Sequence, residues 1–262
     1  MAHSFWKWLA AFGLAVTLSG CAVDFQDTEI AQARMAPSPT RSLPLERTNW
    51  EQLAGLPWPQ GGQRKYQSYD EARRIFWKQL YPEGGTELYC GIDFDGARQI
   101  SLVGESMSVE HVWPADAIAE TEPGCTNRSC TAGRVQRAMA DLQNLWPALQ
   151  KVNSSRSRLR YGTLPQTVKA RFPEVCPGYR RGIGTHAVVE PRDEVKGDVA
   201  RSVVYMHYVY GLPLEDAVSD KDLLLDWMAL DPPDNEELRR NALIDRLQGT
   251  MNPLLESAFM GL

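Results

Sequence analysis

The placement of its cysteines constrains this chain more than any other feature of its 262 residues. The first of five cysteines, Cys21, closes an N-terminal segment that is unlike the rest of the sequence. The other four lie in the region where tryptophan, tyrosine and leucine recur: Cys90, Cys125, Cys130 and Cys176. An even number of cysteines in an exported chain favours two disulfides.

Four cysteines allow three pairings. The short spacing between Cys125 and Cys130 favours a small closed loop, which leaves Cys90 to pair with Cys176. A cysteine-based metal site is the alternative, but the sequence contains no CxxC spacing, which such sites commonly use. We therefore expect disulfides.

Residues 1–20 have the layout of a secretory signal peptide. The apolar run from Trp8 to Leu18 is too short to span a bilayer comfortably. It ends in LSGC, which resembles the lipoprotein box of bacteria, in which the peptide is cut before the cysteine and the cysteine is lipidated. The resemblance implies a lipid anchor at Cys21 and, because Ala22 rather than Asp follows, the outer membrane of the cell envelope. The alternative is an ordinary signal peptide and a periplasmic or secreted protein.

Residues 21–48 contain little apolar periodicity and several breakers (MAPSPTRSLPLER), which indicates a flexible tether. Hydrophobic residues make up 43% of the chain and charged residues 23%, which excludes a wholly disordered or fibrous protein. Residues 49–262 are numerous enough to bury one core and show no repeat or second linker, so we expect one domain.

Capping residues and apolar spacing predict an α+β fold, mostly helical, with a small β element. Ser68 and Glu71 form a capping box before a helix at 69–82, and Asp198 and Asp234 are expected to cap two later helices. The remaining predicted elements are helices at 134–143, 198–210, 220–230 and 234–247, two short strands within 88–103 around a turn at 93–96, and an irregular segment at 115–133.

The net charge of −5 hides an uneven distribution. Residues 128–201 contain 14 basic and 6 acidic residues, whereas the sequences on either side are acidic. A basic stripe can neutralise phosphates of a nucleic acid. The alternative is a solvated surface whose charges pair with the acidic flanks.

Glu110 and His111 are adjacent in the segment SVEHVWP. A carboxylate is a ligand for a metal such as Mg²⁺, and a neutral imidazole can take a proton near pH 7. Asn144, in DLQNLWP, offers an amide oxygen that could complete a metal site. The alternatives are a surface carboxylate beside a partly buried histidine, and an asparagine that ends a helix. The four histidines form no HxH or HxxxH pair, which disfavours a histidine-rich zinc site.

Five blocks occur in order between about Tyr69 and Leu255: EHVWP, DLQNLWP, VNSSRSRLRYG, GDVARSVVYM and LQGTMNPLLE. Together they resemble the bacterial endonuclease I family, exported non-specific nucleases with a ββα-metal active site. The chain departs from the family at Gln143, where the family usually has histidine, and this change could alter support of the metal site.

The resemblance implies a role for each matching residue. Glu110 and Asn144 would hold one divalent ion, Mg²⁺ with Mn²⁺ or Ca²⁺ as alternatives, His111 would be the general base, and Arg128 would steady the phosphate. Two arginines match recurrent positions and would contact phosphate or form structural ion pairs: Arg156 and Arg201. The matches in the last block are expected to be structural: Gln248, Asn252 and Pro253.

The function implied is hydrolysis of DNA, with RNA as a further substrate, by a monomer without sequence preference. The products would carry 5′-phosphate and 3′-hydroxyl ends. The alternative is a non-catalytic, nucleic-acid-binding envelope lipoprotein with the same fold. A serine hydrolase is disfavoured because no GxSxG motif is present.

Overall fold

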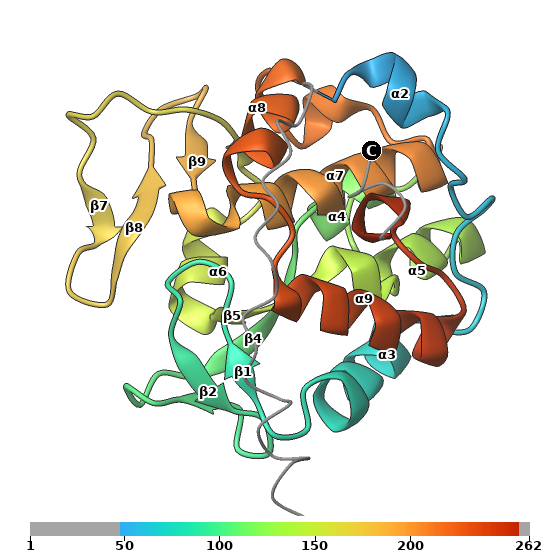
Figure 1. Ribbon diagram of the computed structural model, residues 1–262, viewed down its shortest axis with the longest axis horizontal. Helices are drawn as coiled ribbons and strands as arrows, with labels where there is room; N and C mark the ends of the chain where they lie inside the picture. The colour runs from blue at the N-terminus through green and yellow to red at the C-terminus, as the bar shows by residue number, and fades with distance from the viewer. Residues whose placement is uncertain (1–47, 257–262) are drawn as a thin grey trace, which may run out of the picture. The chain divides into compact units, whose positions relative to one another are not determined.

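Helices make up most of the regular structure in residues 48–256, the part of the chain that the computed structural model describes (Figure 1). The predicted signal peptide, Cys21 and nearly all of the predicted tether lie outside these residues. Within residues 48–256, none of the helices has the length and apolar character needed to cross a membrane. The α-helices are α2, Trp50–Ala54; α3, Tyr69–Ile75; α4, Ala115–Glu120; α5, Gly133–Met139; α6, Gln150–Arg156; α7, Lys196–Tyr210; α8, Asp222–Leu230; and α9, Asn235–Gln248. Single turns of π- or 3₁₀-helix are η1, Phe76–Leu80; η2, Leu142–Asn144; η3, Asp193–Val195; η4, Leu214–Asp216; and η5, Pro253–Leu255.

Helix α7 lies in the core. Nearly all of its 15 residues are buried, as expected for a helix that is apolar around most of its circumference. It packs against α8 and η2 and ends at Gly211, which adopts the left-handed conformation (φ 66°) that glycine favours.

Two of the three predicted helix caps are confirmed. The Ser68 hydroxyl accepts a hydrogen bond from the Glu71 N–H (3.3 Å), and the Asp234 carboxylate accepts one from the Glu237 N–H (2.8 Å). The cap predicted at Asp198 is wrong. Because η3 runs directly into α7, this helix begins at Lys196, and Asp198 lies within its first turn.

Within residues 48–256 the strands form three small sheets. The first is antiparallel, in the order β1-β2-β3, and the second is the antiparallel pair β4-β5. The third has the order β6-β9-β8-β7, with β6 and β9 parallel. The strands are β1, Gly85–Thr86; β2, Asp93–Asp95; β3, Ile100–Ser101; β4, Met107–His111; β5, Leu145–Leu149; β6, Arg160–Tyr161; β7, Ala170–Phe172; β8, Cys176–Arg181; and β9, Val188–Glu190.

Three local predictions are wrong. The turn expected at 93–96 begins later, because 93–95 pair as β2 and the Asp95 carboxylate accepts the Arg98 N–H (2.8 Å) in the turn that follows. The segment 115–133, expected to be irregular, begins with α4, whose apolar residues 117–119 are buried. The helix expected at 134–143 ends at Met139, after which the buried Asp141 carboxylate caps η2 instead.

Strands β4 and β5 and helix α6 form a ββα unit. His111 at the end of β4 lies opposite Leu145 at the start of β5, and every residue of β5 is buried. Helix α6 begins at the residue that follows β5 and packs against both strands. The end of β4, which carries Glu110 and His111, therefore has a fixed position relative to α6.

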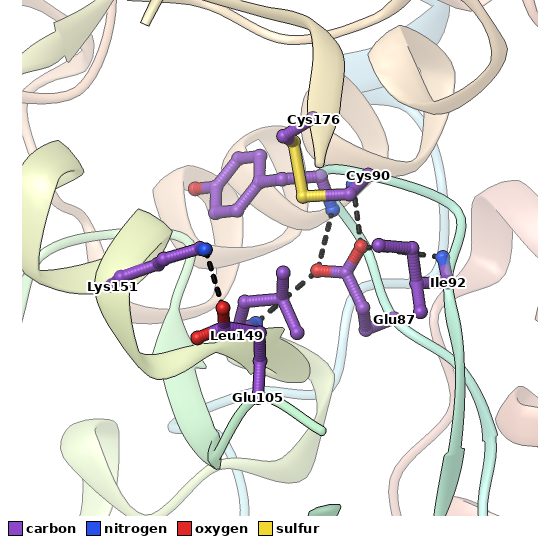
Figure 2. The surroundings of a disulfide bond; sticks show 8 residues. Glu87, Cys90, Ile92, Glu105, Leu149, Lys151 and Cys176 are labelled. Carbon is purple, nitrogen blue, oxygen red and sulfur yellow. Dashed lines mark hydrogen bonds and ion pairs between the residues drawn. A yellow bond between two sulfur atoms is a disulfide. The ribbon is translucent and has the colours of Figure 1, made fainter. Parts of the chain in front are cut away.

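The structure contains both disulfides that the sequence predicts. Cys125–Cys130 closes a loop between α4 and α5, and Cys90–Cys176 joins the segment before β2 to β8. Figure 2 shows the buried Glu87 carboxylate beside the second bond, where it accepts backbone N–H groups of Tyr89, Cys90 and Leu149. Its pKa is raised by burial, although these hydrogen bonds oppose the rise. Glu87 thus ties the disulfide-bonded segment to the end of β5.

Removing Cys90–Cys176 should cost more stability than removing Cys125–Cys130. The bonded residues are 86 positions apart in the first bond and 5 in the second, so the first restricts the unfolded chain more. Chain entropy gives about 4.5 and about 2 kcal/mol, respectively. Urea unfolding of the two double Cys→Ser variants measures these costs. Equal losses, or free thiols found by alkylation and mass spectrometry in the unaltered protein, would contradict this ordering.

Candidate active site

An open cleft of about 740 Å³ lies beside the ββα unit, between α6, the end of β4 and the first turns of α3 and α4. Four of the residues singled out by the sequence line it: Glu110, His111, Arg128 and Arg156. Asn144 and Arg201 are not among its lining residues.

The Glu110 side chain is buried, with 2% of its surface exposed. Its Oε1 accepts a hydrogen bond from the Tyr89 hydroxyl (2.7 Å) and lies 3.3 Å from Nη1 of Arg156. Burial raises the pKa of Glu110, while the Arg156 guanidinium and the Tyr89 hydroxyl oppose that rise. Its Oε2 has no hydrogen-bond partner within residues 48–256. A cation bound at this oxygen would offset the remaining cost of burying the carboxylate.

The His111 ring is held from two sides. Its Nε2 lies 2.9 Å from the Met139 carbonyl oxygen, and the Tyr69 ring packs against it with 4.7 Å between centroids. Because a carbonyl only accepts, Nε2 carries the proton and Nδ1 keeps its lone pair. Burial lowers the pKa of His111 to about 4, so the imidazole is neutral at pH 7. Its Nδ1 is therefore equipped to accept a proton from a water in the cleft.

The structure does not bring Asn144 into this site. Its Oδ1 accepts the Trp113 N–H (2.6 Å) and its Nδ2 donates to the Trp113 carbonyl (3.1 Å), and the residue is fully buried. The carbonyl and the amino group of the Asn144 side chain are thus both hydrogen-bonded to the backbone just after β4. The sequence-based assignment of Asn144 to a metal is corrected by these contacts.

Asn153 on α6 lines the cleft in its place. Its Nδ2 donates to Ser108 Oγ (3.0 Å) and to the Val109 carbonyl (3.1 Å). Since that carbonyl can only accept, the orientation of the amide is fixed, and Oδ1 points away from it without a partner among residues 48–256. The sequence analysis missed Asn153, although the residue lies in the block VNSSRSRLRYG, one helical turn before Arg156.

Comparisons with known proteins show the family of this chain. The family model of Endonuclease I matches residues 79–258, more than half of the chain. The chain belongs to the endonuclease I family. An extracellular deoxyribonuclease of Aeromonas hydrophila is 28% identical over 207 residues, which cover 68% of this chain and 84% of the relative. A periplasmic deoxyribonuclease of the same organism is 29% identical over 207 residues, covering 68% and 81%. An extracellular ribonuclease of Bacillus amyloliquefaciens is 33% identical over 132 residues, covering 44% and 43%.

In this endonuclease I family member, Arg128 and Arg156 have different surroundings. Arg128 lies in the Cys125–Cys130 loop with 76% of its side chain exposed, and its N–H donates to Asp116 (2.8 Å). Arg156 is buried, donates to the carbonyls of His111 (3.0 Å) and Val112, and pairs with Glu110. The exposed Arg128 guanidinium lies 3.7 Å from the Asp116 carboxylate at the cleft, whereas Arg156 holds the end of β4.

Arg201 lies in an ion-pair cluster of α7 and α9 and does not reach the cleft. It is 2% exposed and donates to the Glu237 carboxylate, to Asp198 (3.1 Å) and to the Asp231 carbonyl (2.7 Å). These contacts agree with the structural alternative and correct its assignment to substrate.

Polar residues around η2 also serve the packing of this endonuclease I fold. Gln143 is buried and donates to Asn241 on α9 (2.7 Å), so its replacement of the family histidine does not touch the cleft directly. Gln248 accepts the Leu142 N–H (2.9 Å), and Asn252 donates to the Arg201 carbonyl (3.1 Å). The contacts of these last-block residues agree with structural roles.

The cleft residues fit one type of metal better than others. Across the described residues, 48–256, no cluster of three or more His, Cys, Asp or Glu side chains could hold an ion. Glu110 and Asn153 instead offer one carboxylate and one amide oxygen to a cleft open to water. This donor set fits Mg²⁺, which binds through one or two protein oxygens and keeps several waters, and does not fit zinc, which prefers nitrogen and sulfur.

Substituting Arg201 should lower stability, whereas substituting Arg128 should lower activity. Arg201→Met leaves the buried carboxylates of Glu237 and Asp198 without their cation, which should cost about 3–5 kcal/mol of unfolding free energy. Arg128→Ala, at an exposed position, should leave stability unchanged and lower the rate of nucleic-acid cleavage. Urea unfolding and cleavage assays on both variants test this, and an unfolding midpoint lowered only in Arg128→Ala would contradict it.

Proposed function

We propose that the protein is a metal-dependent endonuclease that hydrolyses phosphodiester bonds of DNA, and also of RNA, without sequence preference. The observation that carries the proposal is that Glu110, Asn153 and His111 line one cleft with unused acceptor atoms. Membership of the endonuclease I family supports the reaction type. Relatives named deoxyribonuclease and ribonuclease support both nucleic acids as substrates.

Glu110 Oε2 and Asn153 Oδ1 would hold a divalent ion, Mg²⁺ in the first place and Mn²⁺ or Ca²⁺ as alternatives. Bound there, the ion would stabilise the negative charge that develops on the phosphate oxygens. The Val109 carbonyl aligns Asn153 with the strand that carries Glu110. Arg156 and Tyr89 hold the other carboxylate oxygen in place.

His111 would act as the general base. Its Nδ1 takes a proton from a water, the water oxygen bonds to phosphorus, and the bond from phosphorus to the 3′ oxygen breaks. This leaves a 5′-phosphate and, once the departing oxygen takes a proton from a water in the cleft, a 3′-hydroxyl end. The Met139 carbonyl keeps the proton on Nε2, so that Nδ1 can accept one, and the Tyr69 ring helps to hold the orientation of the imidazole. Arg128 contacts a phosphate at the rim of the cleft, and such contacts position a strand without specifying its sequence.

The proposal extends to the place of action. A monomer attached to the bacterial envelope through lipid at Cys21 would meet nucleic acid outside the cytoplasm. The two disulfides support an oxidising compartment.

Replacing His111 should remove catalysis but not binding. His111→Ala should lower kcat by about 10²–10⁴, the usual contribution of a general base, while Mg²⁺ and DNA affinities stay unchanged. His207→Ala is the matched control, because His207 also bonds a carbonyl through one ring nitrogen (Leu212, 2.7 Å) but does not line the cleft. Plasmid nicking with and without EDTA measures the rates. A folded His111→Ala protein that cuts at the original rate would favour the non-catalytic alternative.

The two asparagines should behave differently. Asn153→Ala should weaken Mg²⁺ binding and be partly rescued at high Mg²⁺, because it removes a proposed ligand. Asn144→Ala should keep its metal affinity and lose stability, by about 1–3 kcal/mol, because two buried Trp113 backbone groups lose their partner. Calorimetric titration with Mn²⁺ and urea unfolding measure both quantities. Weaker metal binding in Asn144→Ala alone would restore the original assignment.

A further inference from the structure

We propose that the hairpin of β7 and β8, residues 169–181, is a second nucleic-acid contact that binds the phosphate backbone beyond the cleft. We refer to these residues as the β7–β8 arm. The inference rests on the proposed function, since it assigns a further surface to the same substrate.

The cleft alone offers few free cations to a polyanion. Its charged lining residues are Arg73, Arg128, Arg156, Arg158, Asp70, Glu110 and Asp116. Arg156 is occupied by backbone carbonyls, and Arg158 forms an ion pair with Glu120 (2.5 Å). Arg128 lies 3.7 Å from the Asp116 carboxylate, in an exposed ion pair. Duplex DNA carries one charge per about 1.7 Å of its axis, so Arg73 and Arg128 can neutralise only a small part of a bound duplex.

The β7–β8 arm supplies cations that lack an acidic partner. It contains four basic residues and one acidic residue, Glu174. Lys169 and Arg171 are exposed, and neither forms an ion pair with an acidic side chain in the described part of the chain. Arg180, in contrast, pairs with Glu190 (2.5 Å). Arg181 on β8 is only partly exposed, so the exposed cations without an acidic partner among residues 48–256 are on β7 and just before it.

An aromatic ring lies among these charges. The half-buried Phe172 ring has the Arg171 guanidinium 6.0 Å and the Lys151 ammonium 5.8 Å from its centroid. Lys151 also pairs with Glu105 (2.7 Å), as Figure 2 shows. Cations interleaved with an aromatic ring are typical of surfaces that track a nucleic-acid backbone.

The arm is held in a fixed place next to the cleft. Gln150 on α6 lines the cleft, and the next residue, Lys151, lies near the Phe172 ring. The charged residues around Phe172 are therefore adjacent to the cleft. The Cys90–Cys176 disulfide fixes the start of β8, and the Tyr179 ring packs on Tyr89 (5.4 Å). In Figure 1 the arm lies beyond α6, on the side away from α3 and α5. A strand leaving the cleft along α6 would therefore meet it.

The test compares two double charge reversals in the mature protein. The arm variant is Lys169→Glu with Arg171→Glu. The matched control is Lys78→Glu with Arg246→Glu, which changes the net charge equally at exposed positions on η1 and α9 that line no part of the cleft. Binding of a fluorescent 30-base-pair duplex is followed by anisotropy in EDTA over a series of salt concentrations, and cleavage is measured separately with Mg²⁺.

The arm variant should bind about ten-fold more weakly than the control at 0.15 M salt. The slope of log K against log salt should become shallower by about 1.8, which is about 0.9 for each lost phosphate contact. With Mg²⁺, KM should rise and kcat at saturating DNA should stay unchanged. An arm variant with the Kd and salt slope of the control would overturn the proposal.

Two further outcomes have defined meanings. If the arm variant loses binding to phosphatidylglycerol vesicles but keeps its DNA affinity, the arm serves an anionic membrane and the proposal is overturned. Because binding is measured without metal, the arm and the proposed function can fail separately. If the unaltered protein never cleaves DNA but the arm variant has a shallower salt dependence of binding, the proposed function is refuted and the arm is supported. If the unaltered protein cleaves DNA but the arm variant has the salt dependence of the control, only the arm is refuted.

Discussion

The buried guanidinium of Arg156 is the interaction on which the site depends. It lies in the last turn of α6 and donates to the carbonyls of His111 and Val112, where β4 ends. It also neutralises part of the Glu110 charge from 3.3 Å, and its Cζ lies 4.8 Å from the centroid of the Tyr161 ring. One side chain thus fixes the backbone of the proposed base and the carboxylate of the proposed metal ligand. Losing one member of such a buried pair typically costs about 3–5 kcal/mol, so this junction is also a point of global stability.

This arrangement explains how neighbouring residues serve one cleft. Successive side chains of a strand point to opposite faces, so Glu110 and His111 would be separated in the middle of a sheet. Here β4 ends at His111, and Arg156 bonds the carbonyls at that end. The Glu110 carboxylate is directed by Tyr89 and the His111 ring by Met139 and Tyr69. Both side chains line the cleft as a result.

Local signals in the sequence predicted the features that depend on few residues. The caps at Ser68 and Asp234 and the two disulfides follow from short patterns. The choice between Asn144 and Asn153 does not, because it depends on which amide meets the Trp113 backbone, 31 residues from Asn144. The sheet of β6 to β9 was missed because its strands are short and β6 pairs in parallel with a strand distant in sequence. The resemblance left open whether Arg201 contacts phosphate or forms a structural ion pair, because its partner Glu237 lies 36 residues away in the sequence.

The central claim is that the ββα unit presents Glu110 and Asn153 to one divalent ion beside His111. Anomalous diffraction from crystals grown with Mn²⁺ tests it most directly. The account predicts one manganese peak in direct contact with a Glu110 oxygen and with Asn153 Oδ1, at about 2–2.3 Å, waters at its other positions, and His111 Nδ1 facing the cleft without binding the metal. A peak bound by Asn144, or crystals of active protein with no manganese at Glu110, would contradict it.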